Sequence, residues 1–106
     1  MKEAPVEKRL KQRLESVGFK VLKLVTEGTL GSPDRMILRP TWSKGPPFFV
    51  EVKRPSKTER RAQEVVRDQW RGRGALVLDV CDTYERVDEI YTQLMLICVS
   101  EAIQCA

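Results

Sequence analysis

The sequence predicts one α/β domain over residues 1–106, built on a mixed β-sheet. Apolar residues recur at helical spacing in three segments, and short strand-like segments lie between them. Three strand segments follow one another at hairpin distance, which favours antiparallel pairing. The fourth comes after a helix, so we expect it to join the sheet in parallel through a crossover. The predicted order is therefore α-β-β-β-α-β with a further helix at the C-terminal end.

The first helix is expected over residues 4–17. Pro5 suits the first helical turn, where its missing N–H is not needed. The apolar stripe of this helix consists of Val6, Leu10, Leu14 and Val17. Gly18 follows where a left-handed C-cap residue is expected. Residues 19–26 carry apolar side chains on both faces, which is typical of a strand inside a sheet.

The second and third strands are expected over residues 34–39 and 48–53, separated by a turn rich in Pro and Gly. Residues 27–33 are expected to form a loop. The third strand alternates, with Phe48, Val50 and Val52 on one face and Phe49, Glu51 and Lys53 on the other. Such alternation predicts that the two faces of this strand meet different surroundings.

The second helix is expected from Thr58, a suitable N-cap, to about Arg71. Its inner stripe would consist of Ala62, Val65, Val66 and Trp70. Gly72 and Gly74 are expected to end this helix. A fourth strand is then predicted over residues 75–81.

Asp82 and Glu85 have the spacing of a capping box, which predicts the start of a last helix. Its inner face would consist of Val87, Ile90, Tyr91 and Leu94. Residues 94–99 are apolar around the whole helix, so part of this run is expected to lie in a subunit interface. Burial in the core of a single chain is the alternative. The run is too short to span a membrane.

The composition excludes several classes of enzyme. The chain contains no histidine, which removes Ser-His-Asp and Cys-His catalysis and His-ligated zinc. Neither a P-loop nor a G-x-G-x-x-G motif is present. The odd set of cysteines lacks a C-x-x-C pair, which favours a reduced intracellular protein over a zinc knuckle or a disulfide framework. These cysteines are Cys81, Cys98 and Cys105.

The charge pattern favours a polyanionic partner, since the formal net charge is +4. Basic side chains on the first and second helices are expected to contact phosphates without reading bases. Aromatic residues do not alternate with the basic ones, so we expect recognition of shape rather than of sequence. A solvated helix face is the alternative explanation for these basic residues. The N-terminal segment is charged and lacks the apolar region of a secretory signal.

Two carboxylates carry the strongest indication of chemistry. If the second and third strands pair as a hairpin, Asp34 and Glu51 meet at one end of the sheet. Two adjacent carboxylates repel each other, and a divalent cation removes that conflict. Mg²⁺ prefers hard oxygen ligands and keeps several waters. In a chain without histidine, a metal-bound water is the expected nucleophile.

Three further polar residues are expected near that end of the sheet. Lys53 shares a strand face with Glu51 and could orient or help deprotonate a water. Glu7 lies at the border of the first helical stripe, and Gln63 has a similar position on the second helix. Each candidate alone also has an ordinary explanation, such as a turn-capping Asp, a cross-strand ion pair or a helix-surface side chain.

In combination and in this order, the motifs resemble those of the PD-(D/E)xK nuclease superfamily. They are the helical Glu7, G-S-P-D over residues 31–34, E-V-K over residues 51–53, and the helix with Gln63. Within that superfamily the chain is most similar to the VRR-NUC group, the virus-type replication-repair nucleases. The resemblance covers roughly residues 5–81.

The resemblance implies a PD-(D/E)xK restriction-endonuclease-like core and DNA phosphodiester hydrolysis with Mg²⁺ or Mn²⁺. The implied metal ligands are Glu7, Asp34, Glu51 and the backbone carbonyl of Val52. Lys53 would be the catalytic lysine and Gln63 an accessory residue, although the basic segment 55–61 departs from the short polar turn expected before it. The chain looks like the stand-alone viral type, which is similar to homodimeric Holliday-junction resolvases and would act in the host cytoplasm.

Three functional hypotheses follow from the sequence. The first is a Mg²⁺-dependent endonuclease that acts on branched DNA, such as a four-way junction, as a homodimer; a two-fold dimer would present two matching sites to a two-fold junction. The second is a non-catalytic DNA-binding or assembly module that keeps the nuclease fold. The third is a plain interaction domain.

Overall fold

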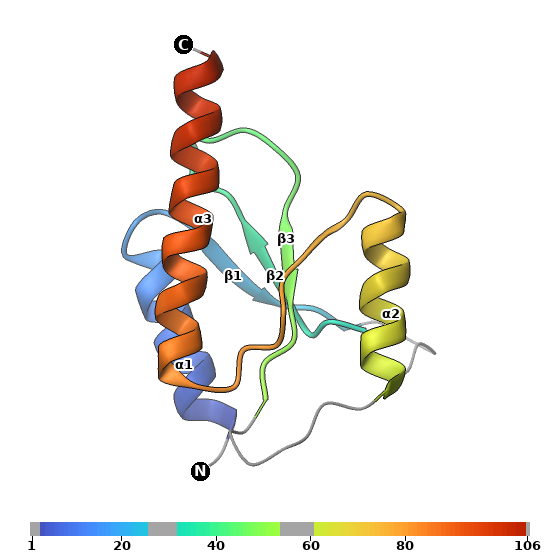
Figure 1. Ribbon diagram of the computed structural model, residues 1–106. Helices are drawn as coiled ribbons and strands as arrows, with labels where there is room; N and C mark the ends of the chain where they lie inside the picture. The colour runs from blue at the N-terminus through green and yellow to red at the C-terminus, as the bar shows by residue number, and fades with distance from the viewer. Residues whose placement is uncertain (1–2, 26–31, 54–60, 106) are drawn as a thin grey trace.

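The computed structural model describes residues 3–25, 32–53 and 61–105 (Figure 1). The elements are α1 (Glu3–Glu15), β1 (Lys20–Lys23), β2 (Arg35–Leu38), β3 (Phe48–Val50), α2 (Arg61–Gly72), β4 (Leu76–Val77) and α3 (Tyr84–Cys105). The sheet has four strands in the order β1-β2-β3-β4. The first two pairings are antiparallel and the β3–β4 pairing is parallel. The predicted element order and the mixed sheet are confirmed.

The helices form layers on both sides of the sheet (Figure 1). Helices α1 and α3 lie side by side on one face, and α2 lies on the other. The alternation of β3 separates these layers, because Phe48 and Val50 are buried with the first pair of helices. Phe49 points the other way and meets Trp70 of α2 edge to face, with ring centroids 5.3 Å apart.

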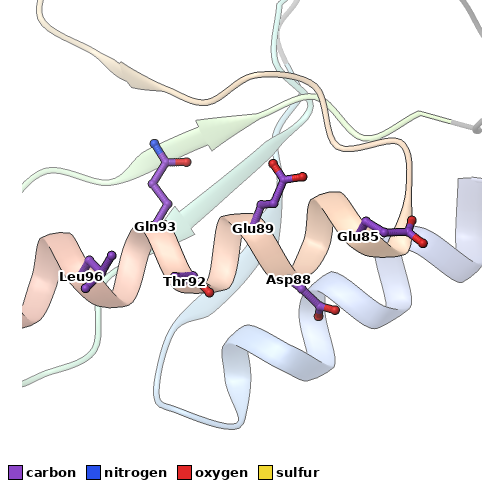
Figure 2. A pocket seen from close by; sticks show the side chains of 6 residues that line it. All are labelled: Glu85, Asp88, Glu89, Thr92, Gln93 and Leu96. Atoms are coloured by element: carbon purple, nitrogen blue, oxygen red, sulfur yellow. The ribbon is translucent and has the colours of Figure 1, made fainter.

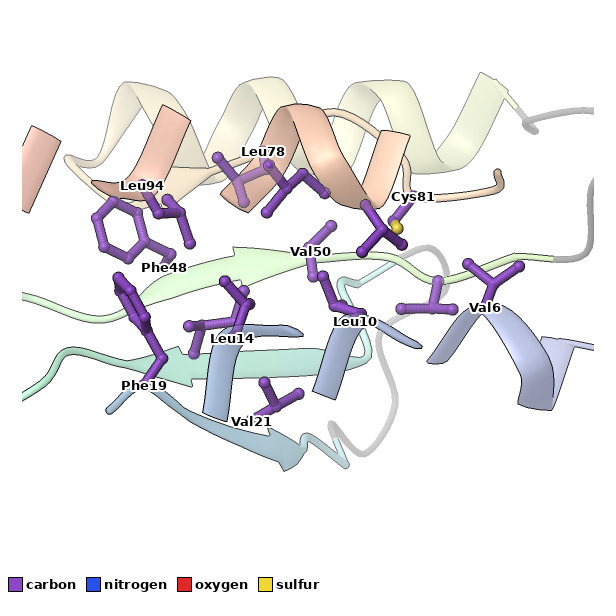
Figure 3. Packing of buried hydrophobic residues seen from close by; sticks show 14 of the residues in the cluster. Val6, Leu10, Leu14, Phe19, Val21, Phe48, Val50, Leu78, Cys81 and Leu94 are labelled. Atoms are coloured by element: carbon purple, nitrogen blue, oxygen red, sulfur yellow. The ribbon is translucent and has the colours of Figure 1, made fainter. Parts of the chain in front are cut away.

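The main core lies between the sheet and the α1–α3 pair (Figure 3). Leu10, Leu14 and Leu94 are fully buried there. They pack with Phe19 and Val50 from the sheet side of the cluster. The helical stripes predicted from 3.6-residue spacing therefore form the contact surface of both helices.

The first helix ends as its glycine predicts. Gly18 has a φ of +101°, and the Phe19 N–H donates to the Leu14 carbonyl at 3.2 Å. A Cβ added to Gly18 would lie 3.2 Å from the Cβ of Pro40, so the next turn packs closely against this cap. Glycine serves here both for its left-handed backbone and for its small size.

Several expected boundaries and contacts are wrong in detail. The regular strands are shorter than predicted, because β1 ends at Lys23 and β3 at Val50. Val65 was expected on the inner stripe of α2, but it is 40% exposed; this helix covers the sheet through Val66 and Trp70. The expected Thr58 cap and the Ala62 side chain lie outside the described residues.

The cap of α3 is also displaced from the predicted Asp82 by one residue. The hydroxyl of Thr83 accepts the N–H of Arg86 at 3.0 Å, and the Thr83 carbonyl accepts the N–H of Val87 at 3.1 Å. Thr83 is therefore the N-cap, and Glu85 does not close a capping box.

Arg39 ties the turn after β2 to the C-terminal half of α3. Its side chain is 4% exposed, and Nη1 lies 2.6 Å from Oε2 of Glu101. Nη1 also donates to the Ser43 hydroxyl at 3.3 Å, and Nε donates to the Pro46 carbonyl at 2.9 Å. The guanidinium lies over the Phe48 ring, 4.8 Å from its centroid. This turn is consequently an ordered part of the domain.

The apolar run of α3 divides between the core and the surface. Leu94 and Cys98 are fully buried. Leu96, Val99 and Ile103 are exposed by 64%, 40% and 70%, which leaves a partly apolar outer face on this helix. None of the helices that the structure describes has the length and apolarity needed to cross a membrane.

Candidate active site

The first site residue, Asp34, is placed by the register of the central hairpin. Arg35 pairs with Val50, so the residue before β2 lies beside the residues that follow β3. Oδ1 of Asp34 accepts the Val52 N–H at 3.0 Å, and the Asp34 carbonyl accepts the Leu24 N–H at 2.8 Å. Asp34 is thus fixed next to the segment that carries Glu51 and Lys53.

The main-chain N–H and C=O of Val52 point to the side of the segment on which Asp34 lies. On its other edge this segment pairs with Cys81, through bonds from the Cys81 N–H to the Glu51 carbonyl at 2.8 Å and from the Lys53 N–H to the Cys81 carbonyl at 2.9 Å. In such a parallel bridge, the N–H and C=O of the central residue point to the opposite side. The Val52 carbonyl therefore points toward the side on which Asp34 lies.

Glu51 and Gln63 meet on the α2 face of the sheet. Gln63 belongs to α2, and its Nε2 donates to Oε2 of Glu51 at 3.2 Å. Both side chains are half buried, as is that of Lys53, two residues after Glu51. The helix thus brings an amide against the carboxylate that the E-V-K motif contributes.

Glu7 of α1 is connected to Asp34 through the guanidinium of Arg35. Nε of Arg35 lies 3.6 Å from Oε1 of Glu7, and Nη1 lies 3.1 Å from Oδ2 of Asp34. The side chains of Glu7 and Asp34 are 28% and 27% exposed, whereas that of Arg35 is 8% exposed. Arg35 joins α1 to the start of β2.

The role of Arg35 was missed from the sequence. A signal was present, because Arg35 alternates with buried Ile37 in β2. A basic residue on the inward face of a strand needs an acidic partner, since lysine and arginine are almost never fully buried unpaired. The border position of Glu7 on α1 makes it one candidate for that partner, without establishing the contact.

These residues converge without forming a preformed metal cage. Asp34, Val52, Glu51 and Gln63 are linked by direct hydrogen bonds or chain adjacency, and Glu7 joins them through Arg35. In the ranges 3–25, 32–53 and 61–105, no three acidic or cysteine side chains form a group that could hold a metal ion. The donor set is nonetheless all oxygen, from carboxylates and a main-chain carbonyl, and it fits Mg²⁺ or Mn²⁺ chemically.

Cys81 is a buried residue that pairs with Val52. Its thiol is fully buried, and burial raises its pKa to about 12. At neutral pH it is therefore a protonated, small apolar group rather than a thiolate ligand.

Some of the basic side chains on α2 and α3 stabilise the fold through contacts within the chain. Arg71 of α2 donates from Nε to the Val77 carbonyl at 2.8 Å, and its Nη2 lies 3.0 Å from Oδ1 of Asp79. The hydrogen bond from Arg71 lowers the pKa of Asp79. Arg86 of α3 donates from Nε to the Val80 carbonyl at 3.2 Å. These two arginines tie α2 and α3 to the β4 segment.

A shallow hollow of about 550 Å³ runs along α3 (Figure 2). It is lined by Glu85, Asp88, Glu89, Thr92, Gln93 and Leu96. Three of these six side chains are acidic and none is basic, so the lining offers no positive charge to a phosphodiester backbone. The strand ends around Asp34 and Glu51 remain the better candidate for a site that acts on nucleic acid.

Comparison with known proteins identifies the family of the chain. The sequence matches no family model, and no curated protein matches it. A solved structure described as a "VRR_NUC domain" superposes with a TM-score of 0.68 at 34% sequence identity, over 83% of this chain and 91% of that chain. With its mixed sheet and helices on both faces, the chain belongs to the VRR-NUC domain family and has the fold of a PD-(D/E)xK-type nuclease.

Proposed function

We propose that this chain is a Mg²⁺-dependent DNA endonuclease with its active site at the strand ends around Asp34 and Glu51. The observation that carries the proposal is the 3.0 Å hydrogen bond from the Val52 N–H to Asp34. This bond brings the aspartate of G-S-P-D against the E-V-K segment, in a chain that belongs to a nuclease family. Mn²⁺ would serve in place of Mg²⁺ with the same oxygen donors.

The metal-holding groups in this proposal are the carboxylates of Asp34 and Glu51 and the carbonyl of Val52. Glu7 of α1 would provide a further carboxylate. When bound, the cation would lower the pKa of a water molecule and neutralise charge on the scissile phosphate. The bond from Val52 fixes Oδ1 of Asp34 and leaves the orientation of this carboxylate well defined. The amide of Gln63 does the same for Glu51.

Lys53 is proposed to act on the phosphate and on the attacking water. Its backbone is held by the bond to Cys81, so the side chain projects from a fixed point two residues after Glu51. An ammonium group there would stabilise negative charge that develops on the phosphorus oxygens. With no histidine in the chain, no imidazole competes for this role.

Branched DNA cut by a homodimer is the finer part of the proposal. The exposed apolar side chains Leu96, Val99 and Ile103 on α3 favour contact with a second copy. A two-fold dimer would carry two sites for the two opposed cuts that a four-way junction requires. Two buried unpaired thiols, Cys81 and Cys98, favour a reducing compartment such as the cytoplasm of a host cell.

Cleavage of a labelled four-way junction beside a linear duplex of matched sequence tests the proposal. Wild type and Lys53→Ala are compared in Mg²⁺ and in EDTA. Lys44→Ala is the control, because Lys44 is exposed in the turn before β3, at the other end of the sheet. We expect Mg²⁺-dependent, symmetric cuts near the branch for wild type and Lys44→Ala, and none for Lys53→Ala.

Other outcomes separate the alternatives. Cutting of flaps or linear DNA in place of the junction would keep the nuclease and exclude the junction preference. Binding of DNA without cutting in Mg²⁺ or Mn²⁺ would favour a non-catalytic module. For that module, the ion pairs of Glu7 and Asp34 with Arg35 would be reason enough to keep these carboxylates.

A further inference from the structure

Arg35 occupies an unusual place for a cation. It begins β2 on the face that packs against α1 and α3, directly across from Val50, which is fully buried. Its side chain is 8% exposed. A guanidinium in such a position is costly unless acidic partners compensate for the lost water. The partners of Arg35 therefore have to be fixed by the fold.

The partners are two of the carboxylates assigned above to the metal. Nη1 lies 3.1 Å from Oδ2 of Asp34 and donates to the Asp34 carbonyl at 3.0 Å, while Nε lies 3.6 Å from Oε1 of Glu7. One positive charge thus faces two negative charges that come from separate elements. A single carboxylate would be enough to compensate Arg35, so these three side chains together carry a formal charge of −1.

We propose that Arg35 is a positioning residue that acts as a resident cation of the site. In the metal-free protein it holds Glu7 and Asp34 near each other and suppresses their repulsion. A divalent cation that binds these carboxylates is opposed by the guanidinium, so Arg35 weakens metal binding while it preserves the arrangement of the ligands. The inference rests on the proposed function, because Glu7 and Asp34 are metal ligands only there.

We expect the charge of Arg35, rather than its hold on the ligands, to decide the direction of the effect on metal affinity. Arg35 and a divalent cation both attract the same carboxylates and repel each other. Removal of the guanidinium charge should therefore tighten metal binding, on the order of tenfold for a charge lying within about 7 Å of the cation in a well-solvated site. It should also destabilise the metal-free protein, because Glu7 and Asp34 lose their shared partner.

The chain provides a matched control in Arg39. Its side chain is also almost fully buried, at 4% exposure, and it also pairs with a carboxylate, that of Glu101. It lies beyond the other end of β2, where no metal ligand is assigned. Arg39→Met should lower stability to the same extent with and without metal, and it should leave metal affinity unchanged.

The experiment is a calorimetric titration of Mn²⁺ into DNA-free protein, with wild type, Arg35→Met, Arg35→Gln, Arg35→Lys and Arg39→Met. If Arg35 acts as a cation, affinity follows charge: the Met and Gln variants bind Mn²⁺ about tenfold more tightly, and the Lys variant stays within threefold of wild type. If Arg35 serves only for packing, all three Arg35 variants depart from wild type together. Use of two neutral variants keeps the test valid if one of them fails to fold.

Thermal unfolding in EDTA and in Mn²⁺ gives a second readout. Mn²⁺ should raise the midpoint of Arg35→Met more than that of wild type, because the metal takes over the missing charge. Unchanged or weaker Mn²⁺ binding by both neutral variants would overturn the inference while leaving the nuclease in place. Absence of Mn²⁺ binding to wild type itself would overturn the proposed metal site, and the role of Arg35 with it.

Discussion

The two ends of strand β2 each carry a buried arginine, and they use it differently. Arg39, after the strand, meets one carboxylate at 2.6 Å, a hydroxyl, a carbonyl and an aromatic ring. Arg35, at the start, is shared by two carboxylates at 3.1 Å and 3.6 Å. At the Arg39 end one guanidinium meets one carboxylate among many short contacts, whereas at the Arg35 end one guanidinium is shared by two carboxylates.

The difference teaches how to distinguish a structural ion pair from a candidate cation site. A structural pair compensates one charge with one charge, and surrounding donors and acceptors complete the shell. A site that awaits a cation leaves carboxylates in excess and fixes them by hydrogen bonds, as the Val52 N–H fixes Asp34 and Gln63 fixes Glu51. Burial alone does not separate the two, since both arginines are almost fully buried.

The largest expected effect comes from Asp34→Asn, which tests the Arg35 end. We expect DNA cleavage to fall on the order of a thousandfold, because a carboxylate proposed to hold the metal loses its charge. The amide oxygen can still accept the Val52 N–H, and Glu7 still compensates the charge of Arg35, so folding and DNA binding should change little. Initial rates on labelled DNA measure the effect. The control is Asp88→Asn, which changes a half-exposed acidic residue of α3. Equal cleavage rates for Asp34→Asn and wild type would show that the active site does not lie at this end.

Arg39→Met tests the other end. We expect a loss of about 2 kcal/mol in the free energy of unfolding, since several hydrogen bonds to a charged group disappear while the half-exposed Glu101 regains water. Urea denaturation measures it. Arg9→Met, whose side chain is 50% exposed and lies 3.8 Å from Asp88, should cost less than about 0.5 kcal/mol. A large loss of cleavage per folded molecule in Arg39→Met would contradict the division between the two ends.

Gly18→Ala perturbs the Arg39 end through its backbone. The positive φ and the 3.2 Å approach to Pro40 predict a loss of about 1 kcal/mol or somewhat more. Gly72→Ala is the matched comparison, because an added Cβ there meets nothing within 4 Å. It should be neutral or slightly stabilising in the same unfolding experiment. Equal destabilisation by the two substitutions would show that the cap at Gly18 has no special role.

The smallest effect is expected at Asp79, which belongs to neither end. The hydrogen bond from Arg71 lowers its pKa below 3.8, so the ionised form is favoured in the folded state. The sign of the shift means that this stabilisation is present above the unfolded pKa and is lost as the pH falls through the lower folded pKa. Because the side chain is 71% exposed, Asp79→Asn should cost at most about 0.5 kcal/mol at pH 7. The difference from wild type should vanish in unfolding measurements at strongly acidic pH; a difference that persists there would require another cause.

Most of the fold could be predicted from local sequence patterns. The stripe of α1 and the glycine after it were predictable because spacing and backbone preference act within a few residues. The N-cap of α3 was not, since Asp82 and Thr83 are both suitable caps and the path of the chain out of the β4 segment decides between them. The exposure of Val65 was not predictable either, because it depends on how far α2 extends over the sheet.

The site divides in the same way. The approach of Asp34 to the Glu51 segment was predictable, because a hairpin between β2 and β3 determines the register at both of its ends. The contact of Arg35 with Glu7 was not, because it depends on the angle at which α1 crosses the sheet. Sequence spacing shows which face a residue occupies but not which residue lies above it.

A buried cysteine also lies near each end of β2: Cys81 comes from the segment after β4, and Cys98 comes from α3. Cys81 lies beside Val52, and the Sγ of Cys98 lies 3.8 Å from Nη1 of Arg39. A buried, protonated thiol reacts with iodoacetamide only during the moments when its surroundings open. With Cys105 replaced by serine, the alkylation rate of Cys81 would report how often the Arg35 end opens. The alkylation rate of Cys98 would report how often the Arg39 end opens. Slower labelling of Cys81 alone, on addition of Mn²⁺ or DNA, would locate binding without any cleavage taking place.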